Sequence, residues 1–160
     1  MVREYDPPTE ARTALALDLS PSPDGPERFE AAVGLAAGIF VSLLAEGVRV
    51  PLIALGANVH SVPVPHERSA PMAPGVGLDL LACAEESGSF APERLLAELD
   101  ARRGGVSALH LVSACRSDTH TRFADALRAR GIEVSLHWIG DQPGEIDPAK
   151  IGAGEVVVLS

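Results

Sequence analysis

Basic residues and cysteines are both scarce in this chain of 160 residues. Thirteen Lys and Arg stand against 22 Asp and Glu, and the formal net charge of −9 disfavours binding to nucleic-acid phosphates or to an anionic membrane surface. We therefore expect no nucleic acid and no direct membrane contact; the charged partners that fit are basic protein surfaces and metal cations. Cys83 and Cys115 have neither disulfide nor zinc-site spacing, which predicts two unrelated thiols in a folded core and a reducing, cytoplasmic setting.

No hydrophobic run is long enough for a membrane span. The longest uncharged run, residues 31–45, has 15 residues, whereas a bilayer requires roughly 18–20. Its Ala and Gly content predicts a buried helix packed against a sheet. Because the start is polar and contains prolines, we expect no signal peptide. With 46% apolar and 22% charged residues, we expect a single domain over 1–160, with an extended lead-in over 1–12.

Apolar patterning predicts strands that alternate with helices. The expected strands are 13–19, 48–55, 59–64, 106–112, 132–138 and 155–159, and the expected helices are about 26–46, 78–86, 92–103 and 118–130. This order predicts an α/β fold: a three-layer, mostly parallel, doubly wound, Rossmann-like sheet with helices on both faces. Prolines push 59–64 to one side as a short antiparallel edge strand.

Details of the first helix support more local predictions. Asp24 and Glu27 have the spacing of a capping-box variant at its start. Gly34 and Gly38 are poor helix formers, so we expect the helix backbone to lie close to a neighbour there. Residues 65–75 read as a surface loop.

Two loops are expected to form the functional crevice. In doubly wound sheets the crevice lies at the carboxyl ends of the strands where strand order reverses, and strands 13–19 and 106–112 are the expected flanks. The loops that follow them are 18–22 and 113–118. We expect residues 18–24, 66–77 and 113–118 to form the rim of a binding surface.

The first of these loops carries a candidate metal site. Asp18, Ser20 and Ser22 place one carboxylate and two hydroxyls at alternate positions after a buried strand, a hard-oxygen set suited to weak binding of Mg²⁺ or Mn²⁺. The alternative is a turn, because Asp, Ser and Pro also cap strands and start helices. Three further residues are candidates for the rim of this site: Asp24, Ser113 and Asp118.

The Asp-x-Ser-x-Ser pattern resembles the start of a von Willebrand factor type A domain, where it supplies part of a metal-ion-dependent adhesion site. Within that class, the segments Val2–Pro7, Leu15–Ser20, Phe29–Val33 and Glu46–Val50 look like domain-of-unknown-function family 58, a bacterial group often encoded beside MoxR-type AAA+ ATPases. The likeness covers most of residues 2–56 and, beyond that, only the order of the elements. It implies a non-enzymatic interaction domain with an AAA+ ATPase or its client as partner. It also implies a longer, membrane-anchored protein of which this is the soluble domain.

Two departures from that family put the metal in doubt. The full site has an Asp at the end of the fourth strand, whereas this chain reads Ser113-Ala114-Cys115, and the nearby Asp118 is more simply a helix cap, as is Ser117. The family also has a Thr in the loop before the central helix, where residues 75–78 offer no hydroxyl. Losing the second acid removes both charge and orientation from the site.

Other chemistries fit less well. A haloacid-dehalogenase-type enzyme needs a second Asp where Ser20 stands, and a cysteine phosphatase needs Cys and Arg six residues apart, whereas Cys115 and Arg122 are seven apart. A small Mg²⁺-dependent α/β hydrolase or phosphotransferase using Asp18 and the 113–118 loop stays open, as does a purely structural domain.

The five histidines form no set at ligand spacing. We expect His110 to be a satisfied sheet residue and His120 and His137 to be exposed. The remaining two, His60 and His66, flank the proline-rich loop.

Overall fold

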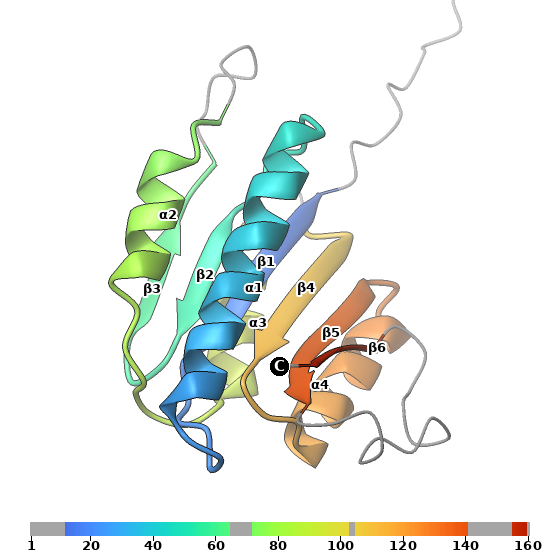
Figure 1. Cartoon of the computed structure of the whole chain (residues 1–160). Helices are drawn as coiled ribbons and strands as arrows, with labels where there is room; N and C mark the ends of the chain where they lie inside the picture. Colours follow the sequence, from blue (N-terminus) through green and yellow to red (C-terminus); the bar gives the residue numbers. More distant parts are fainter. Residues whose placement is uncertain (1–11, 65–71, 103–104, 141–154, 160) are drawn as a thin grey trace, which may run out of the picture.

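The computed structural model describes residues 12–64, 72–102, 105–140 and 155–159. Six strands form one sheet in the order β3-β2-β1-β4-β5-β6 (Figure 1). All neighbouring strands run parallel except β3, which is antiparallel to β2 at one edge. The strands are β1 (Thr13–Asp18), β2 (Leu52–Leu55), β3 (Val59–Val62), β4 (Ala108–Ser113), β5 (Glu133–Gly140) and β6 (Glu155–Leu159).

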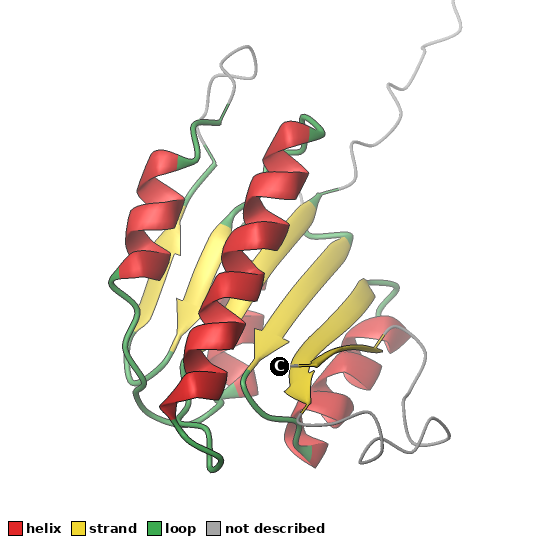
Figure 2. Ribbon diagram, in the orientation of Figure 1, coloured by secondary structure: helices red, strands yellow, loops and turns green. Residues whose placement is uncertain are grey.

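In the part of the chain that the structure describes, four helices complete three layers, as the alternation of elements predicts. They are α1 (Pro26–Ala45), α2 (Gly75–Ala82), α3 (Pro92–Asp100) and α4 (Asp118–Ala129). Helices α1 and α2 cover one face of the sheet, and α3 and α4 cover the other (Figure 2).

The central strand β1 shows why the sheet needs both layers. All six of its residues are buried. Leu15 and Leu17 belong to the core under α1, whereas Ala14 and Ala16 belong to the core over α3 and α4. A strand covered on both faces is apolar on both, as residues 14–17 are here, which is the pattern of a parallel sheet.

Helix α1 differs from the prediction at its start and along its outer face. Its N-cap is Gly25, with a φ of 109° and no side-chain cap, because Asp24 instead pairs with Arg28 at 2.8 Å. Gly34 and Gly38 are exposed, and among the described residues a Cβ added to either would meet nothing within 4 Å, so this part of the chain provides no close neighbour there. The close approach is made from the other helix: a Cβ on Gly77 of α2 would lie 2.4 Å from the Phe40 ring.

Helix α1 is long and apolar enough to cross a membrane by length and composition alone. In this fold its inner face packs on the sheet, with Phe29, Ala32, Ala36 and Phe40 buried. The packing of its inner face on the sheet agrees with the prediction from residues 31–45, but its outer face, with Val41 43% exposed, is not buried. The expectation that no run here is long enough for a membrane span is not confirmed, because the whole helix meets that criterion by length and composition. Cys83, by contrast, is exposed just after α2, so the expectation that both thiols lie in the core is wrong for this one.

The carboxyl ends of β1 and β4 lie side by side at the middle of the sheet, where the strand order reverses, as predicted. The arrowheads of β2, β4 and β5 mark this edge, the lower one in Figure 1. Residues 72–77 do not lie here: β3 runs back toward the opposite edge, where Val62 pairs with Leu52, and α2 begins from that side. Residues 66–71, also expected on the rim, lie outside the described residues.

Candidate functional site

The centre of the candidate site is the carboxylate of Asp18, at the last position of β1 and fully buried. Its Oδ1 accepts hydrogen bonds from the Ser20 backbone N–H at 2.9 Å and the Ser20 hydroxyl at 2.7 Å. Its Oδ2 lies 2.7 Å from His120 Nε2 and 3.0 Å from Ser113 Oγ. Since an ionised carboxylate only accepts, Nε2 carries the proton and donates it.

These contacts keep the carboxylate charged in a buried place. Burial, the largest single influence, raises the pKa of Asp18, but the hydrogen bonds from His120 and Ser20 outweigh it. The pKa of Asp18 therefore lies below its ordinary value of 3.8.

His120 occupies the first turn of α4, and the structure corrects the expectation that it is exposed: it is only 4% exposed. Its Nδ1 lies 2.6 Å from Ser117 Oγ, and its ring stacks on Phe90 with centroids 4.1 Å apart and planes 16° from parallel. Ser117 is the N-cap of α4, one of the two caps considered from the sequence. The signal for His120 was present in the helix periodicity, because the buried face of α4 consists of His120, Phe123, Ala124 and Leu127.

The turn between β4 and α4 brings Ser113 to the site. The Ser113 hydroxyl lies 2.7 Å from the Cys115 carbonyl as well as near Asp18, and it accepts from the Cys115 N–H at 3.3 Å. Burial raises the pKa of the Cys115 thiol, and the negative charge of Asp18 raises it further. A thiol held protonated in this way is a poor nucleophile, which argues against cysteine phosphatase chemistry.

The remaining predicted residues, Ser22, Asp24 and Asp118, do not belong to the hydrogen-bond network described around Asp18. Ser22 Oγ accepts from the Asp24 N–H at 3.3 Å within its own loop. Asp24 pairs with Arg28, and Asp118 is exposed in the first turn of α4. The structure thus gathers Asp18, Ser20 and Ser113 at one point but not the other three.

A loop that sequence reasoning overlooked does reach this edge: residues 83–91, between α2 and α3. Its Ser87 N–H donates to the Leu19 carbonyl at 2.8 Å, and Ser87 Oγ accepts from the Ala57 N–H at 3.2 Å. Gly88 has a φ of +68° and lies against this backbone, where a Cβ would be 2.6 Å from Ala57 N. The loop before α3 therefore holds hydroxyls, Ser87 and Ser89, which residues 75–78 lack.

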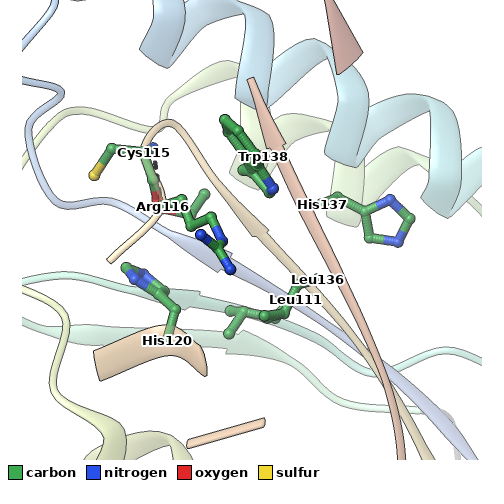
Figure 3. A pocket seen from close by; sticks show the side chains of 8 residues that line it. Leu111, Cys115, Arg116, His120, Leu136, His137 and Trp138 are labelled. Atoms are coloured by element: carbon green, nitrogen blue, oxygen red, sulfur yellow. Dashed lines mark hydrogen bonds between the residues drawn. The ribbon is translucent and has the colours of Figure 1, made fainter. Parts of the chain in front are cut away.

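The hollow beside His120 is small. Its volume of about 10 Å³ has room for one water molecule (Figure 3). The side chains around it come from β4, β5, α4 and the turn before α4. Among them, the Trp138 indole N–H is buried and has no hydrogen-bond partner among the described residues. The full lining is Leu111, Ser113, Cys115, Arg116, His120, Leu136, His137 and Trp138.

A second polar pair lies in the sheet itself. His110 Nδ1 and His137 Nε2 are 3.0 Å apart, so His110 has the satisfied position in the sheet that was expected. His137 is 9% exposed, which contradicts the prediction of an exposed side chain. Burial lowers the pKa of His110, and burial followed by the neighbouring His110 lowers the pKa of His137 to about 4. Both rings are therefore neutral near pH 7; His60 is exposed, and His66 lies outside the described residues.

The arrangement around Asp18 is a poor fit for a divalent metal. Both carboxylate oxygens are already engaged, and Ser22 points into its own turn. Among the residues that the structure describes, no three His, Cys, Asp or Glu side chains are grouped to hold an ion. The metal site at Asp18, Ser20 and Ser22 therefore stays a prediction.

Compared by sequence, the chain matches no family model and no curated protein. Compared by structure, it is similar to a von Willebrand factor type A protein from Catenulispora acidiphila, with a TM-score of 0.59 and 18% identity over 92% of this chain and 38% of that one. It is also similar to BatB, a conserved hypothetical protein from Bacteroides thetaiotaomicron (TM-score 0.54, 18% identity, 81% of this chain and 66% of that one). A third similar structure is proximal thread matrix protein 1 from the mussel byssus (TM-score 0.57, 14% identity, 82% and 38%).

These neighbours define the class: the chain has a von Willebrand factor A-like α/β fold, as predicted. It spans less than two thirds of the length of each of the three proteins. At 18% identity or less, the likeness concerns the fold alone.

Proposed function

We propose that this chain is a protein-interaction domain that binds its partner at the carboxyl edge of the sheet. The observation that carries the proposal is the construction of that edge. A buried network around Asp18 ties together the ends of β1 and β4 and the start of α4, while the hollow beside it holds no more than a water molecule. An edge that buried hydrogen bonds tie together, and whose described residues enclose only a water-sized hollow beside Asp18, is suited to binding a protein surface.

The exposed charges at this edge favour a basic partner. Asp24, Glu85, Glu86 and Asp118 are all exposed; the first three lie on loops and Asp118 lies in the first turn of α4. Of these four, Asp24 is already paired with Arg28. Together with the net charge of −9, they would speed association with a positively charged surface.

The narrower proposal is that the partner is a MoxR-type AAA+ ATPase or its client. Its support is the resemblance of residues 2–56 to domain-of-unknown-function family 58. The same resemblance supports a cytoplasmic location as the soluble part of a membrane-anchored protein.

Charge reversal tests both levels of the proposal. Glu85→Lys with Glu86→Lys changes the binding edge, and Glu46→Lys, at the far end of α1, is the matched control because Glu46 is also exposed. Binding to a purified MoxR-type ATPase is measured by biolayer interferometry at low and high salt. We expect the double variant to bind at least about tenfold more weakly at low salt and the control to bind normally.

Equal loss in both variants would contradict binding at this edge. Undiminished binding in both would do the same. No binding by the unaltered chain would remove the ATPase as partner and leave the edge to be tested with other basic proteins.

A second candidate is a hydrolase, and one observation favours it. Ser117 Oγ, the His120 ring and the Asp18 carboxylate form an unbroken hydrogen-bonded chain, the connectivity that activates a serine nucleophile. Asp18 itself is fully buried and cannot reach a substrate, so Ser117 would be the attacking group. Labelling by a fluorophosphonate that is lost in Ser117→Ala would support this reading, and no labelling of the folded chain would reject it.

A further inference from the structure

We propose that the His120 imidazole takes the place of a divalent cation at Asp18, so that this edge is assembled without metal. The proposal stands on the geometry of the buried cluster and holds whether or not the interaction proposal does.

His120 occupies the position at Asp18 where a cation would bind. The Asp-x-Ser-x-Ser motif begins at Asp18, the last residue of β1, which is where a hard-oxygen metal site would require it. The group that lies 2.7 Å from Asp18 Oδ2, however, is a nitrogen that carries a proton. A cation bound to Oδ2 would have to displace this N–H, and Oδ1 is already held by two bonds from Ser20. A solvated cation therefore meets no free carboxylate oxygen.

His120 also connects the segments that meet at this edge. A metal ion would link the loops of this edge by ligating residues from several of them, and His120 makes the same links by other means. It bonds to Asp18 at the end of β1, it bonds to Ser117 at the start of α4, and its ring stacks on Phe90 in the loop before α3. With 4% of its surface exposed, this side chain is an internal part of the edge.

The end of β4 lacks the second acidic residue that a full metal site would have. The end of β4 supplies Ser113, a neutral hydroxyl, where a second carboxylate would raise metal affinity. The single carboxylate of Asp18 is satisfied by donors from Ser20, Ser113 and His120, whereas a second carboxylate at this point would require a cation to balance its charge.

Metal titration of the wild-type chain and of His120→Ala provides the test. Protein stripped with EDTA is melted alone and with about 5 mM MgCl₂ or MnCl₂. We expect the melting temperature of the wild type to change by less than about 1 °C. His120→Ala, in which Oδ2 loses its donor and gains space, should melt lower without metal and rise by several degrees with Mn²⁺; His60→Ala, an exposed histidine, should behave as the wild type.

The same response of wild type and His120→Ala to Mn²⁺, whether a rise in both or in neither, overturns the proposal. Should His120→Ala fail to fold, nitrogen-15 NMR of the wild type decides. We expect a slowly exchanging Nε2–H signal and no selective Mn²⁺ broadening at Ser20 and Ser113. Selective broadening that disappears in Asp18→Asn would show a metal site instead. No partner protein is used, so the result is separate from that of the interaction test.

Discussion

The pair His110 and His137 predicts that mild acid weakens the fold. The pKa of His137 falls from 6.5 to about 4 in the folded chain. Between these values the unfolded chain takes up a proton that folded His137 does not. The stability contributed by neutral His137 therefore declines as pH drops through this window, and this contribution does not change further below it. A shift of one pKa unit corresponds to about 1.4 kcal/mol, so the shift of His137 can lower the free energy of unfolding by at most about 3.4 kcal/mol. The ring keeps some contact with solvent, and we expect about 1–2 kcal/mol after screening.

The measurement is urea unfolding followed by circular dichroism at about pH 7.5 and about pH 4.5, with wild type, His137→Gln and His60→Gln. Glutamine cannot titrate, so His137→Gln should lose about 1–2 kcal/mol less than the wild type on acidification. The exposed His60 provides the control and should leave the pH dependence unchanged. An identical pH dependence in wild type and His137→Gln would refute the reasoning.

The remaining predictions concern the Asp18 carboxylate, Gly88 in the 83–91 loop and the outer face of α1, and all are measured by urea unfolding. Asp18→Ala leaves its buried donors without an acceptor and should cost about 3 kcal/mol or more, whereas Ser22→Ala, which loses one exposed bond, should cost less than about 1 kcal/mol. Because the pKa of Asp18 is lowered, its contribution is complete above pH 3.8 and is lost as pH falls through the folded value; a wild-type curve flat down to pH 2 would contradict this. Gly88→Ala should cost about 1–3 kcal/mol, because its φ is +68° and its Cβ would strike backbone. Gly34→Ala should instead stabilise α1 by about 0.5–1 kcal/mol, and destabilisation there would show that the open face is covered.

Much of the fold could be predicted from local pattern. The alternation of buried strands with amphipathic helices predicts a parallel sheet, and Pro63 marks β3 as the exception at its edge. The boundaries of the elements are harder to predict. Helix α2 spans Gly75–Ala82, whereas the sequence predicts 78–86, because its two glycines and the apolar residues that follow give no clear N-cap.

The placement of the rim loops shows where local pattern is insufficient. Which edge a loop reaches depends on the direction of the strand before it. Since β3 is antiparallel, residues 72–77 start from the amino edge, and 83–91 is the segment that arrives beside Asp18.

Asp18 could be identified because the end of a buried strand and a run of hydroxyls are both visible in sequence. His120 lies 102 positions further on, and its contact with Asp18 depends on β1 and β4 being neighbours. A polar side chain is expected to be exposed, but the place of His120 beside Phe123, Ala124 and Leu127 on one helix face indicates burial. Phe90 has no such local signal, because only tertiary packing brings it onto the imidazole.

The reversal of direction at β3 has a practical use. Val62 and Gly75 both stand on the side of the molecule away from Asp18. A peptide tag or fluorophore inserted between them would hold the domain on a sensor surface with its acidic loops facing outward into solution.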